Sequence, residues 1–205
     1  MDKSFENKIK EDLLKSGYGA EMKALRVFFK EGWDATGLYS YYDLDERRTR
    51  ESDIEATITK YESNKDKVIA QTFFQIIAEV KKSEKPWVIF KEVPYWDWKL
   101  GEMWNSIISS SGFEINKKVT NSLSKYSLSS EMGWLGIGIH ESFKKPNNTS
   151  NWHSAFISVC KACEYSLEQN GDSDSSYPHL FFIKPLLILE GTLLAAYIWK
   201  IMEKL

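Results

Sequence analysis

The feature that most constrains the fold is an apolar run, residues 68–78, which ends in Glu79, Val80 and Lys81. A run rich in β-branched and aromatic residues between polar segments is typical of a buried strand. Residues i and i+2 of a strand share a face. Glu79 and Lys81 should therefore project together, while Val80 faces the core on the other side. The run predicts a long central strand over residues 68–82 with an acid and a lysine at its end.

A second acidic segment lies upstream, within residues 52–60. Ile54 and Ala56 alternate with Asp53 and Glu55, which predicts another half-buried strand. If this strand pairs with residues 68–82, Asp53 comes beside Glu79. Glu55 shares the face of Asp53, where it could be an extra ligand or a solvent-exposed acid.

Two carboxylates at such a separation repel each other unless a cation lies between them. Mg²⁺ takes hard oxygen ligands and usually keeps several waters. Asp53, Glu79 and the backbone carbonyl of Val80 could supply three ligands to Mg²⁺ or Mn²⁺. A bound metal lowers the pKa of a water, and Lys81 could orient or deprotonate that water or stabilise the transition state. This pattern favours metal-dependent phosphodiester hydrolysis.

The remaining segments alternate between helix and strand patterns. In chain order we expect a helix over residues 4–17, strands over 22–30 and 38–42, a polar connection over 43–48, a polar loop over 61–67, a strand over 87–90, a helix over 99–109, a strand over 134–140, a helix over 151–170 and a strand over 183–190. This order predicts one mixed α/β domain over residues 1–205, with a variable insertion or loop region around residues 94–150.

Composition narrows the function less than the motifs do. The 205-residue chain has a net charge of −2, so a nucleic-acid contact would need a local basic patch. Lys82, Lys85 and Lys91 flank the acidic pair and are the candidates. The N-terminus has no signal-peptide pattern, and Lys184 interrupts the apolar stretch near the C-terminus. We therefore expect a cytoplasmic protein that does not enter a membrane.

Three motifs together carry a family resemblance. These are an aromatic hairpin with the Tyr-Tyr and Asp-Glu segment of residues 41–46, Arg-x-x-Asp-Ile-x-Ala at residues 50–56, and Glu-x-Lys-Lys-Ser-x-Lys-Pro-Trp at residues 79–87. With a preceding helix that carries a Glu, they resemble the PD-(D/E)XK, restriction-endonuclease-like nuclease superfamily, and most closely an uncharacterised bacterial branch of it. The resemblance covers residues 4–92, with weaker agreement over 151–193.

The resemblance implies a restriction-endonuclease-like αβββαβ core, in which a central mixed sheet is flanked by helices. It implies that Asp53 and Glu79 bind Mg²⁺ or Mn²⁺, that Lys81 is catalytic, and that Glu6 is an auxiliary acid near the metal. Ser52 departs from the proline that often precedes the first acid. A Gln-x-x-x-Tyr motif is absent from the sequence, which argues against the RecB-like branch.

The expected function is a magnesium-dependent endonuclease that hydrolyses DNA. Two alternatives stay open: a non-catalytic module that binds nucleic acid or a protein, and a partner-gated nuclease effector in phage defence. The sequence does not separate DNA from RNA, or endonuclease from exonuclease. The chain could act as a homodimer or as a subunit beside a partner protein.

Overall fold

The computed structural model describes residues 3–65, 67–92, 108–111, 135–144, 150–171 and 178–197. In these residues the helices are α1 (Lys3–Lys15), α2 (Tyr18–Lys30) and α6 (Asn151–Gly171). The strands are β1 (Asp34–Asp43), β2 (Arg48–Asn64), β3 (Lys67–Lys82), β4 (Trp87–Glu92), β5 (Ile108–Ser111), β6 (Leu135–Glu141), β7 (His179–Glu190) and β8 (Leu193–Tyr197).

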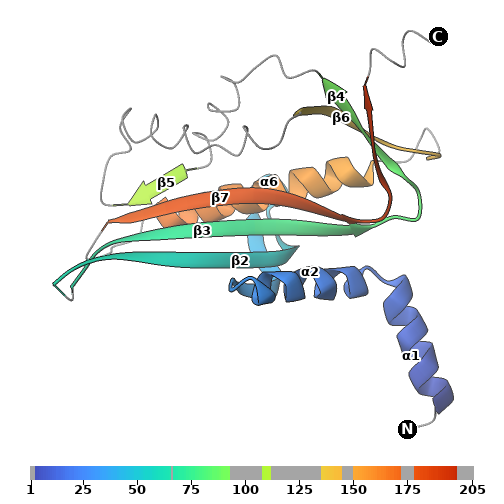
Figure 1. The fold of residues 1–205 in the computed structure, drawn as a ribbon, viewed down its shortest axis with the longest axis horizontal. Coiled ribbons are helices and arrows are strands. Elements are labelled where there is room, and N and C mark those ends of the chain that lie inside the picture. Colours follow the sequence, from blue (N-terminus) through green and yellow to red (C-terminus); the bar gives the residue numbers. More distant parts are fainter. Residues whose placement is uncertain are drawn as a thin grey trace.

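The main sheet has five strands in the order β1-β2-β3-β7-β5 (Figure 1). Strands β1, β2 and β3 are antiparallel neighbours, β7 runs parallel to β3, and β5 pairs antiparallel with β7. The sheet is therefore mixed, and the predicted apolar strand is its middle member. The α/β class expected from the sequence is confirmed.

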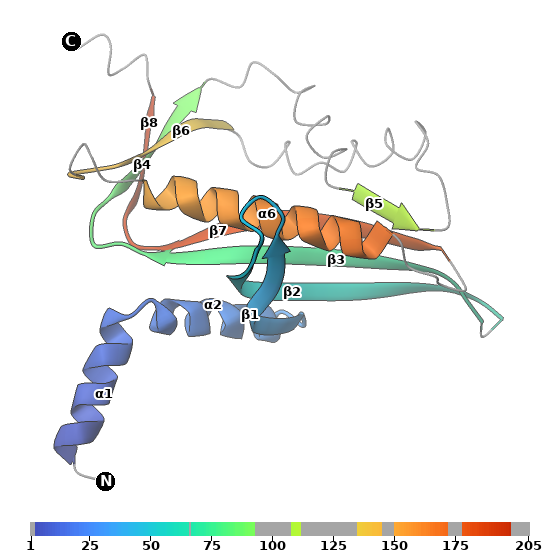
Figure 2. The ribbon, with the colours of Figure 1, turned by 180° about the vertical axis from the view of Figure 1, so that it is seen from behind.

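Two helices cover opposite faces of this sheet (Figures 1 and 2). On one face α2 contributes Ala20 to a core with Ile54 and Val80. On the other face α6 packs Val159 and Cys163 against Ile77 and Phe181, among others. Since successive residues of β3 enter opposite cores, the strand is buried on both faces, and its near-continuous apolar sequence follows from that. Helix α1 projects away from the sheet (Figure 2).

A second sheet of three strands, in the order β6-β4-β8, continues from the first. Both β3 and β7 bend out of the main sheet at the same corner, and their continuations β4 and β8 pair in parallel. At this corner the Ser83 amide donates to the Glu190 carbonyl at 3.1 Å. A Cβ on Gly191 would lie 2.5 Å from the Ser83 carbonyl oxygen, so only glycine fits this close approach.

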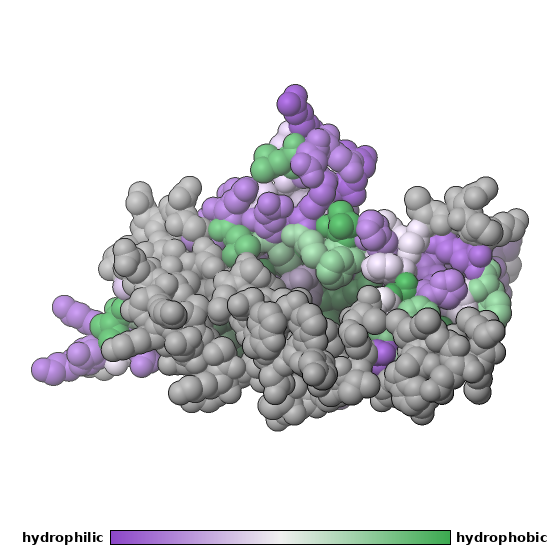
Figure 3. Space-filling view, turned by 90° about the horizontal axis from the view of Figure 1, so that it is seen from above, coloured by the Kyte–Doolittle hydropathy of each residue, from purple (hydrophilic) through white to green (hydrophobic). Residues whose placement is uncertain are grey.

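The long β2–β3 hairpin extends to the left in Figure 1, beyond the helices. Its tip carries the exposed residues Lys60, Glu62, Lys65 and Lys67. Seen from above, the described residues visible at this end include hydrophilic side chains beside a hydrophobic group (Figure 3). None of the described helices is long and apolar enough to cross a membrane.

Two segment predictions were wrong. Residues 22–30 form part of helix α2 and not a strand, because Ala20, Ala24 and Phe28 recur at helical spacing and pack together on the sheet. The polar segment 61–67 is mostly strand, because the cross-strand pairing of β2 and β3 continues to Asn64 and Lys67. Most of the expected helix over 99–109 and of the insertion 94–150 lies outside the described residues. Residues 108 and 109, which are described, belong to strand β5 and not to a helix.

Candidate metal-dependent site

Asp53 and Glu79 meet where β2 and β3 cease to pair. The last pair of the β2–β3 register at this end is Ile54 with Ala78, and each of these residues is adjacent in the chain to one of the acids. Just beyond it, the Val80 amide donates to Asp53 Oδ2 at 2.7 Å. The Asp53 carboxylate thus accepts a hydrogen bond from a backbone amide of β3, and this bond fixes Asp53 against that strand.

Lys81 places its ammonium group between the two acids. Its Nζ lies 2.6 Å from Glu79 Oε2 and 3.6 Å from Asp53 Oδ2. Burial by itself would lower the pKa of Lys81, but the hydrogen bond to Glu79 and the charges of Glu79 and Asp53 outweigh it. The pKa of Lys81 is therefore raised above its ordinary value, and one cation offsets two carboxylates here.

Glu79 is nearly buried, with 5% of its surface exposed, and two hydroxyls hold it. Ser52 Oγ donates to Glu79 Oε1 at 3.3 Å, and Ser158 Oγ donates to the same oxygen at 3.2 Å. Ser158 lies on α6, and its hydroxyl also contacts the Tyr41 hydroxyl at 3.1 Å. Sequence reasoning did not single out Ser158 and included Tyr41 only as part of an aromatic motif, because the contacts of Ser158 with Glu79 and with Tyr41 arise only when α6 packs on the sheet.

The alternation of side chains along β2 breaks beside Asp53. In a regular strand Ser52 and Asp53 would point to opposite faces, yet both have contacts within this site. The pairing partner of Asp53 would be Leu38, but the register passes from Gly37–Ile54 directly to Tyr39–Ser52. Leu38 has a φ of 60°, in the left-handed region, so this kink in β1 accompanies the break.

Glu21 is a helix acid that interacts electrostatically with this site, and the role predicted for Glu6 stays a prediction. Burial raises the pKa of Glu21, and the carboxylates of Asp53 and Glu79 raise it further, while Lys81 acts in the opposite direction. Glu21 lies on α2, which packs on the sheet, whereas Glu6 lies on the projecting α1. Both helices carry an acid in the first turn, so the sequence could not choose between them without knowing which one docks.

Asp53 and Glu79 supply some of the oxygen ligands that a hard divalent cation requires, but not all of them. Two carboxylates at the end of a sheet offer oxygen ligands of the type that Mg²⁺ prefers. No group of three or more Asp, Glu, His or Cys side chains in the described part of the chain is arranged to hold a metal. A metal at Asp53 and Glu79 would therefore depend on backbone oxygen, water and substrate for its other ligands. The assignment of the Val80 carbonyl as a metal ligand stays a prediction, because the contact between Val80 and Asp53 is made by the Val80 amide.

The three lysines predicted to contact nucleic acid lie on different parts of this end of the molecule. Lys82 is exposed at the end of β3, and by alternation it points away from the face of Glu79 and Lys81. Lys85 lies in the turn before β4 and donates to the Phe143 carbonyl at 2.9 Å. Lys91 lies on β4, in the second sheet. They lie on three different segments of the chain, and their role stays a prediction.

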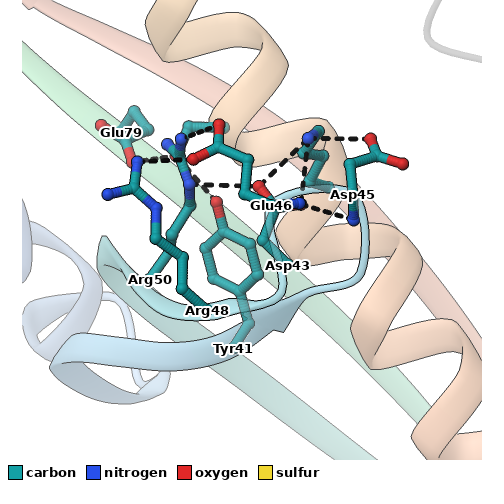
Figure 4. A network of polar contacts seen from close by, with 9 residues as sticks. Tyr41, Asp43, Asp45, Glu46, Arg48, Arg50 and Glu79 are labelled. Carbon is teal, nitrogen blue, oxygen red and sulfur yellow. Dashed lines mark hydrogen bonds and ion pairs between the residues drawn. The ribbon is translucent and has the colours of Figure 1, made fainter.

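A polar network ties the β1–β2 turn to α6 beside the site (Figure 4). Asp43 is 2% exposed, and both of its carboxylate oxygens accept hydrogen bonds from Lys161 Nζ at 3.0 Å. Arg50 Nε lies 3.1 Å from Asp43 Oδ2, and the guanidinium also binds Glu46. These contacts anchor the strand that carries Tyr41 to the helix that carries Ser158.

The comparisons with known proteins give no relative: no family model, no curated protein and no solved structure matches this chain. The basis for a function is therefore the sequence motifs, the fold and the geometry of the site.

Proposed function

We propose that this chain is a metal-dependent nuclease that hydrolyses phosphodiester bonds, with DNA as its substrate and Mg²⁺ or Mn²⁺ as its cofactor. One observation carries the proposal: Asp53 and Glu79 are held together at the end of the β2–β3 ladder with Lys81 between them. Like charges at this separation are costly, and a cation between them offsets that cost. Such perturbed clusters of acids and bases are concentrated at functional sites.

In this mechanism Asp53 and Glu79 are the protein ligands of the metal, with the Val80 carbonyl as a third. The bound metal supplies an acidified water and positive charge for the phosphate in the transition state. Ser52 and Ser158 orient Glu79, and Asp53 is oriented by the Val80 amide. The raised pKa of Lys81 keeps it a cation, so it is placed to orient the water by donating a hydrogen bond or to stabilise charge on the phosphate. Glu21 takes the auxiliary role that was expected of Glu6.

The order of elements gives the proposal a second support. Helix α2, strands β1 to β3, helix α6 and strand β7 follow one another in the order helix, three strands, helix, strand, with β4 to β6 inserted. This is the order of the restriction-endonuclease-like αβββαβ core that the motif resemblance implies. We include that core in the proposal, with the acids on its central strands.

A specific observation favours the alternative of a non-catalytic binding module. Lys81 already contacts both carboxylates, so part of their repulsion is offset without a metal. In that case the three side chains would be a partly buried ion-pair cluster that fixes the end of the sheet. Metal binding and cleavage distinguish the two functions.

The test compares wild type with Lys81→Ala and with a matched neighbour, Lys82→Ala. Each protein is incubated with Mg²⁺ or Mn²⁺ and with linear duplex DNA, circular duplex DNA, single-stranded DNA or RNA. We expect wild type to cleave DNA and Lys81→Ala to lose roughly 10²–10³-fold in rate, as for loss of a group that stabilises charge in the transition state. Lys82→Ala should retain the rate and lose only substrate affinity, because its side chain points to the other face.

The outcomes separate the functions. Cutting of circles establishes an endonuclease, and cutting of RNA alone would replace the DNA assignment. Cleavage by Lys81→Ala at the wild-type rate would refute the mechanism. Absence of cleavage on every substrate, with no change in melting temperature on adding either metal, would favour the binding module. Metal binding without cleavage would favour an effector that waits for a partner.

A further inference from the structure

A cavity of about 520 Å³ lies on the α6 face of the main sheet, near the C-terminal end of that helix. Glu55, Gln75 and Asn170 are among its lining residues. Gln75 and Glu79 are four residues apart on one face of β3, which corresponds to about 13 Å. Ile77 lies between them and packs under α6 in the core. The cavity is thus separate from the acid pair, and its size is that of a small-molecule site.

One wall of the cavity is aromatic. Phe73 on β3 and Phe181 on β7 are stacked, with ring centroids 4.4 Å apart and planes 4° from parallel. His179 meets the Phe73 ring edge-on, with centroids 5.5 Å apart. Phe73 is only partly buried, so the wall offers apolar aromatic surface to a ligand. Such surface favours a planar group, which can pack against the rings.

Glu55 gives the cavity a hydrogen-bond acceptor in addition to its aromatic wall. Its carboxylate accepts from the Gln75 amide, and Gln75 Oε1 in turn accepts from Ser166 Oγ at 2.7 Å. Gln75 and Ser166 are both buried, which fixes the amide and through it the carboxylate. Asn170 donates to the Ser166 carbonyl at 2.8 Å and completes this arrangement. Glu55 is therefore a positioned acceptor and not a freely moving surface acid.

The charge of the lining restricts the ligand further. The residues described around the cavity include two carboxylates, Asp34 and Glu55, and neither Lys nor Arg. A phosphate or carboxylate ligand would be repelled. A planar group with N–H donors would fit instead. Its flat face can pack against the aromatic wall, and a carboxylate accepts two parallel N–H groups in one plane.

We propose that this cavity binds a planar ligand that presents two parallel N–H donors, and that Glu55 is its acceptor. A guanidinium group and the Watson–Crick edge of guanine share this chemistry. The ligand could therefore be a guanidino metabolite or a guanine base. Further polar groups line the cavity: Asn170 on α6, and Thr57 and Thr59 on the same strand as Glu55. The proposal does not depend on the nuclease function, since the acid pair takes no part in it.

The test uses isothermal titration calorimetry on the full chain, without metal or nucleic acid. The probes are agmatine, guanosine and, as a control that lacks the paired donors, adenosine. The variants are Glu55→Gln, which keeps the shape and removes the charge, and Glu62→Gln, an exposed acid of the same strand outside the cavity. We expect binding of agmatine, guanosine or both by wild type and Glu62→Gln, and binding at least about tenfold weaker by Glu55→Gln.

Each result decides the matter. Binding of agmatine alone identifies the guanidinium source, binding of guanosine alone identifies the base, and both support the proposal. No binding of either at millimolar concentration, equal binding by Glu55→Gln, or equal binding of adenosine would overturn it. Melting temperatures of the variants establish that each is folded. Lys81→Ala, included in parallel, should bind like wild type, so a failed nuclease assay leaves this result interpretable.

Discussion

Ser158 on α6 donates a hydrogen bond to Glu79 Oε1 on β3 across 3.2 Å. The helix therefore holds a carboxylate of the sheet, although the two residues are far apart in the sequence. The Tyr41 hydroxyl lies 3.1 Å from the same serine and extends the contact to β1. Three elements thus determine where one carboxylate lies, and the position of Glu79 depends on how α6 is packed.

Replacing Ser158 by Ala should act on the reaction more than on substrate binding. Glu79 would keep Ser52 as a donor but lose its link to α6. We expect the free energy of unfolding to fall by about 1 kcal/mol. Under the proposed function kcat should fall roughly tenfold to hundredfold through misplacement of a ligand, with KM little changed. Steady-state kinetics and urea unfolding measure the two effects.

Ser154→Ala is the matched control for that experiment. Ser154 is exposed on the same helix, and its hydroxyl donates to the backbone carbonyls of Ser150 and Asn151 at 3.1 and 3.2 Å. Its removal should leave kcat unchanged. Equal kinetic losses in the two variants would mean that the hydroxyl of Ser158 does not position Glu79.

Asp53→Ala should remove stabilisation by divalent metal. A ligand at a hundred times its Kd stabilises the native state by about 2.7 kcal/mol, which for a chain of this size raises Tm by roughly 5–10 °C. Wild type should show this rise with Mg²⁺ or Mn²⁺, and Asp53→Ala should not. Differential scanning fluorimetry measures the rise in Tm on adding metal for each protein. Because each protein is compared with itself, a different Tm of Asp53→Ala without metal does not affect the comparison.

Glu62→Gln serves here as the control carboxylate, because it is exposed at the hairpin tip. It should keep the full shift in Tm. If the shift survives in Asp53→Ala, the metal binds elsewhere and the proposed ligand set is wrong. A shift lost in Glu21→Gln as well would identify Glu21 as a ligand in place of Glu6.

Asp43 should make stability depend on pH in the acid range. Burial by itself would raise the pKa of Asp43, but hydrogen bonds from the Glu46 amide and from Lys161 outweigh it, so the pKa is lowered. A carboxyl with a lowered folded pKa contributes stability above its unfolded pKa of about 3.9, and this contribution is lost as pH falls through the folded pKa.

The measurement is the urea midpoint of wild type and Asp43→Asn between about pH 2 and pH 7. Wild type should be more stable than the variant above the unfolded pKa, and the difference should shrink as the carboxyl becomes protonated below it. Asp45→Asn, at a side chain that is 81% exposed, should change the midpoint little. A difference between wild type and Asp43→Asn that is independent of pH would show that charge is not the cause.

Gly191→Ala should destabilise the corner between the two sheets. The added Cβ would lie 2.5 Å from the Ser83 carbonyl oxygen, so the strands must move apart. The expected cost is about 1–3 kcal/mol, as for other overpacked sites. Gly19→Ala is the control, because its nearest atom would be the Leu13 carbonyl oxygen at 3.8 Å and alanine favours the helix. Equal melting temperatures of Gly191→Ala and Gly19→Ala would contradict the close approach of Gly191 to the Ser83 carbonyl.

Part of this molecule follows from its sequence alone. The apolar run that ends in Glu79 and the alternation around Asp53 predicted two strands, and β2 and β3 do pair so that these acids lie together. The stripe of residues 151–170 predicted helix α6. Local periodicity is sufficient here because each segment buries one continuous face, which the pattern of side chains records directly.

Residues 22–30 show where local patterns stop being informative. Met22, Val27 and Phe29 are exposed in helix α2, so apolar side chains occupy both the buried and the solvent face of that helix. A nine-residue segment with apolar residues on all sides reads equally as a strand. The helix is established by its docking on Ile54 and Val80, and these residues are far away in the sequence.

The sequence determined which residue types the site contains: two acids and a lysine at strand ends, with the lysine two residues after the second acid. Only the tertiary structure decided which helix acid approaches them, which hydroxyls hold Glu79, and that Glu55 belongs to a different cavity with Gln75. Spacing along a strand is fixed by backbone geometry and can be read from the chain. Contacts between elements depend on how faces pack in three dimensions, and neither Ser158 nor Glu21 carries a local signal of that packing.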